Sequence, residues 1–325
     1  MLRPVRVLSI DGGGVRGYLP ALLLAEIERR AARPATTLFD LVVGTSTGGI
    51  IGIGLATGLS AQSLADFYPT YGQRIFGVGG TFSEQMGSGA RYIGRMFGGN
   101  PAYGGNARHR PDGLEGVLRD VLGDTLLSQA AIDLAITSFD GLTSRPVVFS
   151  RRDARTATSW DLPLRDVARA TSAAPTYFPP LDIDWAGRRC RFIDGGVWAN
   201  NPSAVAVSES LVLTAGKGMT GQSVFLVSLG TGVAPAGVAF EGTSSWIGSA
   251  GDLVKTATSV AAGELIALRA LPEQNYRRLQ VVDNRVAGAM DDPSSQRLGV
   301  LKAAADDLIL DKSADLDEIV ARLVA

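Results

Sequence analysis

The feature that most constrains the fold is a unit that occurs twice near the N-terminus. Residues 5–10 form a short apolar segment, and a glycine-rich turn at 11–17 follows it. A segment with a leucine or isoleucine at every fourth position comes next. The same order returns with the apolar residues 41–43 and the glycine-rich turn 44–49. Two successive strand, turn and helix units predict the α/β class, with a mainly parallel central sheet covered by helices.

Later segments extend this prediction without marking a boundary between domains. Apolar runs predict further strands and one helix: strands at 134–139, 147–149 and 224–229, and a helix at 114–122. Helical spacing is clearest in the last residues, 316–324, where Asp315 and Glu318 are predicted to form a capping pair. No repeat or linker composition is present, so we expect a single domain over residues 1–325.

One segment, about 72–113, departs from the pattern. It carries many glycines and aromatic residues and no sustained periodicity. Long segments of this kind are usually either functional or disordered. We therefore expect a flexible, lid-like insertion, and a merely disordered insertion stays open as the alternative.

The composition excludes several classes of function. The 31 basic and 32 acidic side chains give a net charge of −1, which removes the broad positive surface that binding to a nucleic acid polymer requires. One cysteine and one histidine can form neither an internal disulfide nor a structural zinc site, which needs about three or four such ligands. No cofactor is expected, although calcium held by carboxylates stays open.

The N-terminus shows no signal peptide, and the most apolar segment, 49–59, has about half the roughly 20 residues that a membrane span needs. We therefore expect a cytoplasmic protein that meets the inner membrane surface only peripherally.

Ser46 is the candidate nucleophile. Residues 44–48, Gly-Thr-Ser-Thr-Gly, fit the pattern in which small flanking residues let a serine sit on a sharp turn between strand and helix. The pentapeptide alone is weak, because a glycine-rich chain often produces it by chance. Its place between a predicted strand and a predicted helix strengthens the prediction.

The base for this serine is predicted to be a carboxylate. The single histidine, His109, lies in a basic segment and is expected to be a solvated surface residue. Asp194 is the best candidate, because it ends an apolar strand-like pair and is followed by two glycines that allow another backbone to approach. A free aspartate is a feeble base, so its pKa must be raised by burial. A plain turn at Asp194 is the competing interpretation.

The first glycine turn can supply the remaining chemistry. The amides of Gly12, Gly13 and Gly14 are candidate donors to an oxyanion, and Arg16 is a candidate for a substrate phosphate or for a structural contact. The turn also fits a dinucleotide-binding fingerprint, which leaves an oxidoreductase as an alternative function. That fingerprint expects an acid after the next strand, whereas Asp40 precedes it.

Together these motifs resemble those of the patatin-like phospholipases. The resemblance covers about residues 5–282 and rests on segments 11–17, 44–49, 170–175, 194–196, 200–202, 228–232 and 275–280 in this order. It implies a three-layer α/β/α fold and an oxyanion hole at Gly12, Gly13 and Gly14. It also implies a dyad of Ser46 and Asp194 without histidine, and cleavage of phospholipid acyl esters at a membrane surface through an acyl-enzyme. A noncatalytic lipid-binding protein is the second alternative function.

Residues 194–202 and the compact length further resemble bacterial members of this family that act as cyclic-dinucleotide-activated effectors in anti-phage defence. The resemblance implies a cyclic dinucleotide as activator. The basic stretch 151–155 is the candidate for contact with such a nucleotide or with anionic headgroups.

Overall fold

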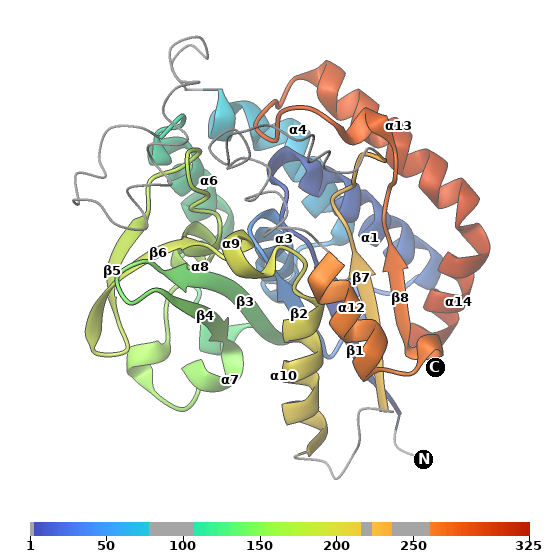
Figure 1. The fold of residues 1–325 in the computed structure, drawn as a ribbon, viewed down its shortest axis with the longest axis horizontal. Coiled ribbons are helices and arrows are strands. Elements are labelled where there is room, and N and C mark those ends of the chain that lie inside the picture. The colour runs from blue at the N-terminus through green and yellow to red at the C-terminus, as the bar shows by residue number, and fades with distance from the viewer. Residues whose placement is uncertain (1–2, 78–106, 216–222, 236–260) are drawn as a thin grey trace, which may run out of the picture.

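The computed structural model describes residues 3–77, 107–215, 223–235 and 261–325. Eight strands form one mixed sheet in the order β5-β6-β3-β2-β1-β7-β8, with β4 paired to β3 (Figure 1). Their bounds are β1 Val5–Ile10, β2 Leu41–Gly44, β3 Asp133–Asp140, β4 Arg145–Ser150, β5 Leu181–Trp185, β6 Arg188–Asp194, β7 Val224–Leu229 and β8 Tyr276–Leu279. Strands β3, β2, β1, β7 and β8 run parallel to one another, whereas β4 and β6 pair with β3, and β5 with β6, in antiparallel fashion. The predicted α/β class and mainly parallel sheet are confirmed.

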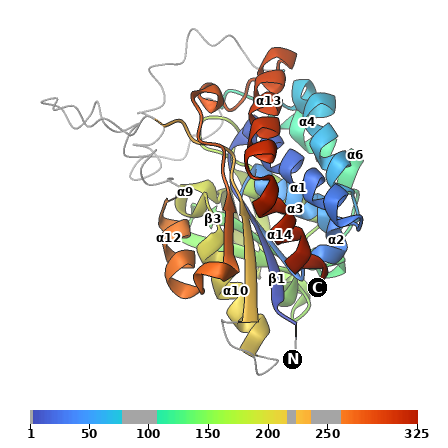
Figure 2. The ribbon, with the colours of Figure 1, turned by 90° about the vertical axis from the view of Figure 1, so that its right-hand side faces the viewer.

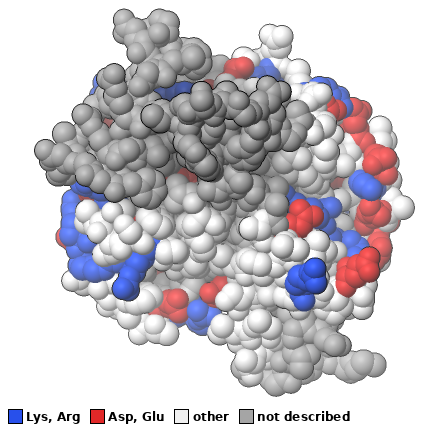
Figure 3. Space-filling model, viewed as in Figure 1, with Lys and Arg blue, Asp and Glu red and all other residues white. Residues whose placement is uncertain are grey.

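Helices cover both faces of the sheet, so that three layers result (Figure 2). The larger layer contains α1 Tyr18–Ala31, α2 Ala35–Leu38, α3 Thr47–Ala56, α4 Ala61–Phe76, α6 Pro111–Leu122, α8 Leu164–Thr171, α13 Ser295–Asp311 and α14 Ser313–Val324. The smaller layer contains α9 Gly196–Ala199, α10 Ser203–Ala215 and α12 Ala261–Ala270, and α7 Arg151–Ala154 follows β4. Figure 3, drawn from the side of the smaller layer, shows few charged side chains across the centre of this face.

The sheet has a hydrophobic core on each face, one under each helical layer. This explains why the central strands are continuous apolar runs in the sequence. In β1, Leu8 and Ile10 belong to the core under the larger layer, whereas Val5 and Val7 belong to the core under the smaller one. A strand that is buried on both faces needs apolar residues at successive positions. The sequences of such strands therefore differ from those of strands with one solvated face, in which apolar and polar residues alternate.

Two sequence predictions need correction. Helix α14 begins at Ser313, where Lys312 precedes it without a side-chain cap, so Asp315 and Glu318 form no capping pair. Glu318 instead pairs with Arg277. The ends of the lid-like segment 72–113 are helical, because α4 continues to Phe76 and α6 starts at Pro111. The rest of that segment, 78–106, lies outside the described residues. Within the described ranges, no helix is long and apolar enough to cross a membrane.

Strand β3 brings two strand ends together. Strand β4 pairs along one edge of β3 over Ala135–Asp140, so β2 and β6 must share the opposite edge. There β2 pairs in parallel up to Ile136, and β6 pairs antiparallel from Asp140 back to Ser138. The carboxyl ends of β2 and β6 therefore meet head-on beside Thr137.

Candidate active site

Ser46 lies on the sharp turn between β2 and α3, as the sequence predicts. Its backbone has φ 55° and ψ −123°, a conformation that a residue with a side chain rarely adopts. A Cβ at Gly48 would meet the backbone carbonyls of Ile10 and Asp11, so only glycine fits beside this turn. The serine side chain is largely buried, with 9% exposed.

The turn is fixed by a hydroxyl from another part of the chain. The Ser46 amide donates a hydrogen bond to Thr171 Oγ1 at 2.8 Å, and Thr171 is the last residue of α8. The Ser46 carbonyl accepts from the Ile50 amide at 3.0 Å and so begins α3. Sequence reasoning did not single out Thr171; its only signal was its place in segment 170–175.

Asp194 ends β6, and its carboxylate lies beside the Ser46 hydroxyl, which lowers the pKa of this carboxyl. Its Oδ1 also accepts the Gly196 amide at 2.7 Å, and the residue is 4% exposed. Burial raises the pKa of Asp194 to about 6, although the hydrogen bonds from Ser46 and Gly196 oppose the rise. The structure thus brings together the two residues that the sequence proposed as nucleophile and base.

Thr137 fills the junction between the two strand ends. Its hydroxyl lies 2.7 Å from Thr45 Oγ1, and Thr45 donates to the Ala199 carbonyl at 2.6 Å. Because Thr45 has one hydroxyl proton, Thr137 must donate to Thr45. A Cβ at Gly195 would lie 2.7 Å from Thr137 Cβ, so the glycine after Asp194 permits the close approach.

The glycine loop lies directly beside Ser46. A Cβ at Gly12 would be 3.2 Å from Ser46 Cβ. The Gly12 amide, however, donates to the Asn200 carbonyl at 2.9 Å, so this amide is not free for an oxyanion. The amides of Gly13 and Gly14 have no acceptor among the described residues. The three predicted donors therefore reduce to two.

A buried ion pair holds the start of this loop. Arg278 on β8 donates to both carboxylate oxygens of Asp11, at 2.9 and 2.5 Å, and to Ser228 at 2.7 Å. Burial raises the pKa of Asp11, and the charge of Arg278 opposes that rise. The Thr231 hydroxyl adds a hydrogen bond of 2.7 Å to the Gly12 carbonyl. Sequence reasoning assigned no role to Arg278 or Thr231, whose only signals were segments 275–280 and 228–232.

Similarity to known proteins gives the family of this chain. The model of the family described as patatin-like phospholipase matches residues 8–207. The chain belongs to the patatin-like phospholipase family. Patatin-like protein 2 of rice (Oryza sativa) is 34% identical over an alignment of 226 positions, which covers 64% of this chain. The chain spans about half, 53%, of that relative.

Two further similarities cover almost the whole chain. Patatin-T5 of potato (Solanum tuberosum) is 29% identical over an alignment of 353 positions, which covers 96% of this chain and 85% of the relative. Among solved structures, VipD from Legionella pneumophila covers 96% of this chain and 67% of its own, with 13% identity and a TM-score of 0.46. The patatin-like match includes Ser46, Asp194 and the glycine loop, whereas Thr231 and Arg278 follow its end at residue 207.

In this patatin-like chain the Arg16 guanidinium forms hydrogen bonds within the protein. Its Nη1 donates to the Gly232 carbonyl at 3.4 Å and its Nη2 to Met290 Sδ at 3.2 Å. Burial and the nearby Arg297 lower its pKa. These contacts, to a carbonyl and a thioether, favour a structural role for Arg16 over binding of a substrate phosphate.

His109 is not the solvated surface residue that the sequence predicts. It is 7% exposed, its ring packs against Phe76 and Phe178 at 5.5 Å, and its Nε2 lies 2.9 Å from Asp291 Oδ2. Charged sequence neighbours suggested exposure, but rings from distant segments cover the side chain. The hydrogen-bond partner of this only histidine is Asp291 rather than Ser46.

The basic stretch 151–155 is occupied by internal contacts. Arg151 pairs with Asp133 at 3.0 Å, and Arg152 pairs with Glu209 at 2.9 Å. Arg155 donates to the Ser128 carbonyl at 3.1 Å. In the part of the chain that the structure describes, no group of three or more His, Cys, Asp or Glu side chains could hold a metal ion.

Proposed function

We propose that this chain is a serine acyl hydrolase that cleaves fatty-acyl esters of phospholipids through an acyl-Ser46 intermediate. The observation that carries the proposal is the placement of Ser46, on its strained turn, beside the buried carboxylate of Asp194. A carboxylate with a pKa near 6 is a better base than an exposed aspartate, whose pKa is near ~3.9. Family membership supplies the substrate class.

The first half of the reaction forms the acyl-enzyme. Ser46 Oγ attacks the ester carbonyl carbon while its proton passes to Asp194. The carbonyl oxygen becomes an oxyanion, to which the Gly13 and Gly14 amides donate. When the tetrahedral intermediate collapses, the bond to the leaving alcohol breaks and Asp194 returns the proton to that oxygen. The lysophospholipid leaves, and the acyl group remains on Ser46.

The second half uses water in the same way. Asp194 takes a proton from water as the water oxygen attacks the acyl carbon, and the same two amides stabilise the second oxyanion. Collapse releases the fatty acid, and the proton on Asp194 returns to Ser46 Oγ. Histidine takes no part, because His109 is engaged by Asp291.

The proposal includes no nucleotide activator. The arginines of 151–155 that suggested one have acidic or carbonyl partners within the chain. The dinucleotide-binding oxidoreductase is likewise not proposed, because the glycine loop belongs to the region that the patatin-like family model matches. Phospholipid, presented at a membrane surface, is the partner that we propose.

The deciding experiment is covalent labelling by a fluorophosphonate together with release of fatty acid from phosphatidylcholine vesicles. We expect both signals in the wild type and neither in Ser46→Ala. Ser210→Ala is the matched control, because Ser210 is a buried serine whose hydroxyl donates to the Val207 carbonyl of its own helix. Labelling that survives in Ser46→Ala would contradict the proposal, and so would lipid binding or nucleotide binding without labelling.

The pH dependence of the hydrolysis gives a second test. Asp194 must be ionised to accept the proton, so the rate should rise as pH passes through about 6 and level off above it. A rate that is constant from pH 5 to 8 would argue against Asp194 as the base.

A further inference from the structure

A segment near the C-terminus lies against the glycine loop at the proposed oxyanion donors. The Met290 carbonyl accepts the Val15 amide at 2.8 Å, and Met290 Sδ accepts from Arg16 Nη2 at 3.2 Å. A Cβ at Gly14 would run into the same carbonyl, which leaves room only for glycine, here at φ 58°. Met290 therefore borders the residue whose amide is one of the two free donors.

The next residue, Asp291, is tied to a different part of the chain. Its Oδ2 lies 2.9 Å from His109 Nε2 and 3.5 Å from Arg108 Nη1. The side chains of Asp291 and His109 are only 14% and 7% exposed, so water weakens this pair less than it weakens a surface pair. The hydrogen bond from His109 lowers the pKa of Asp291, which keeps the carboxylate charged.

His109 is itself firmly placed. Its amide donates to the Tyr177 carbonyl at 3.0 Å, and the Arg108 amide donates to Thr176 at 2.9 Å. The His109 ring packs against Phe76 and Phe178. The anchor for Asp291 is thus fixed by backbone hydrogen bonds and by ring packing.

From this chain of contacts we infer that Asp291 is a positioning residue for the oxyanion donors. His109 fixes Asp291, Asp291 fixes the adjoining Met290 carbonyl, and that carbonyl fixes the turn that presents the Gly14 amide. The inference rests on the proposed function. Residues 290 and 291 follow the end of the family match at residue 207, so the match does not itself predict this role.

The energetic consequence concerns the transition state rather than substrate binding. Removing one oxyanion donor outright typically costs about 100-fold to 1,000-fold in kcat. A donor that is displaced rather than removed should cost less, and we expect about a tenfold loss of kcat. Ser46 and Asp194 stay in place, so KM and the rise in rate near pH 6 should change little.

The test uses Asp291→Asn, His109→Phe and the double variant. Asparagine keeps the size of the side chain but removes its charge, and phenylalanine keeps the ring contacts but removes Nε2. We expect each single variant to lower kcat on phosphatidylcholine by about tenfold, with KM within about twofold of the wild type. Both changes act on the same contact, because Asp291→Asn removes its charge and His109→Phe removes Nε2. The double variant should therefore be about as slow as the slower single variant.

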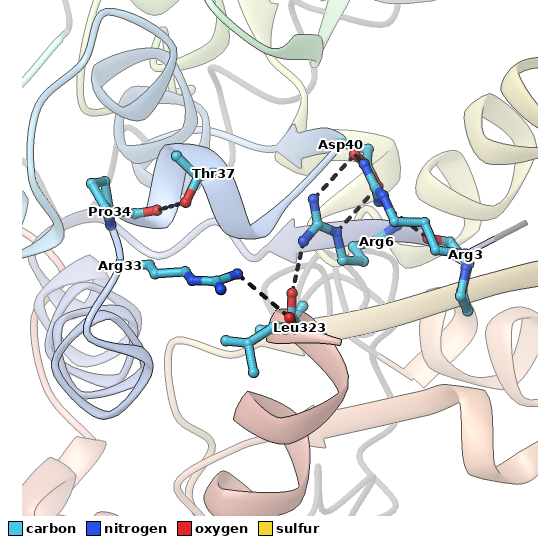
Figure 4. Close-up of polar contacts among 9 residues, drawn as sticks. Arg3, Arg6, Arg33, Pro34, Thr37, Asp40 and Leu323 are labelled. Atoms are coloured by element: carbon cyan, nitrogen blue, oxygen red, sulfur yellow. Dashed lines mark hydrogen bonds and ion pairs between the residues drawn. The ribbon is translucent and has the colours of Figure 1, made fainter.

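Asp40→Asn is the matched control. Asp40 is also a part-buried carboxylate with two basic partners, because the Arg3 guanidinium donates to it at 2.7 Å and Arg6 Nη2 at 3.3 Å (Figure 4). It precedes β2, at the amino ends of the parallel strands and opposite Ser46. We expect Asp40→Asn to lower Tm without lowering kcat per folded molecule.

The inference would be overturned by a kcat within twofold of wild type in both single variants, or by effects that multiply in the double variant. A loss that Asp40→Asn reproduces would overturn it as well. Retention of hydrolysis by Ser46→Ala would instead reject the proposed function, so the two failures can be told apart.

Discussion

Strands β2 and β6 lie on the same edge of β3 and end at the same point, yet they reach it in opposite ways. Strand β2 is parallel to β3, reads Leu-Val-Val-Gly and is buried at every position. Strand β6 is antiparallel, begins with two exposed arginines and becomes fully buried only at Phe192–Asp194. The first delivers Ser46 and the second delivers Asp194.

The difference shows how two kinds of constraint can build one site. Ser46 is held through its backbone, since the strained turn, the start of α3 and a hydrogen bond from its amide to the Thr171 hydroxyl all fix its main chain. Asp194 is tuned by its surroundings, because burial at the end of an otherwise half-exposed strand raises its pKa. The serine end should therefore respond to backbone changes and the aspartate end to changes in charge.

Asp194→Asn should have the largest effect. Asparagine keeps an oxygen that can accept the Gly196 amide but cannot take the Ser46 proton. We expect hydrolysis to fall by at least about 1,000-fold, the range in which loss of a catalytic base falls. Steady-state fatty-acid release at pH 8 measures it, and a fall below tenfold would make Asp194 a structural partner of Ser46 only.

Stability should show the opposite pH trend to activity. The folded-state pKa of Asp194 is near 6, above its ordinary value of 3.8, so the folded state binds this proton more tightly than the unfolded state does. The contribution of this proton to the free energy of unfolding is fully present below about pH 3.8 and is lost as pH rises through 6. The loss lowers the free energy of unfolding by about 2 to 3 kcal/mol.

Urea unfolding of the wild type and Asp194→Asn at pH 4.5 and pH 8 measures that cost. The variant should gain stability relative to the wild type by about 2 kcal/mol between the two conditions. A difference that does not change with pH would show that Asp194 titrates normally.

Thr137→Val tests the junction between the two strand ends. Valine has nearly the same shape but cannot donate to Thr45. We expect a loss of about 1 kcal/mol in the free energy of unfolding and a reduction of kcat of about threefold. Chemical denaturation and vesicle assays measure both, with Thr143→Val on the exposed β3–β4 turn as control. Unchanged kcat would mean that the two ends keep their relative position without this bond.

Ser46→Gly should stabilise the protein relative to Ser46→Ala, which is opposite in sign to the loss expected for Thr137→Val. Glycine adopts a positive φ without strain, and relief of this strain stabilises the folded state by roughly 1 to 3 kcal/mol. Glycine also loses more backbone entropy on folding, which costs about 0.5 to 1 kcal/mol. A net gain of about 1 kcal/mol over Ser46→Ala is expected in urea unfolding. Equal stabilities of the two variants would show that the turn stores no strain.

The sequence located the central strands of the sheet better than its two edge strands, β5 and β8. The predicted strands at 5–10, 41–43 and 224–229 are confirmed, because strands buried on both faces carry continuous apolar runs. Strands β5 and β8 were not predicted. Strand β5 alternates with exposed aspartates, and β8 has only four residues, two of them arginines. Their pairing comes from neighbouring strands rather than from local composition.

The sequence by itself determined the fold class and the turn that carries Ser46, because these depend on residue types within a few positions. It also showed, from composition alone, that the chain has a single histidine. Only the tertiary structure decided which amides stay free beside Ser46, that His109 is buried, and that Asp194 meets the serine. Those outcomes depend on partners far apart in the chain, such as His109 and Asp291, 182 positions apart, and Asp11 and Arg278, 267 apart. Strand register and side-chain packing create such contacts, and no local pattern encodes them.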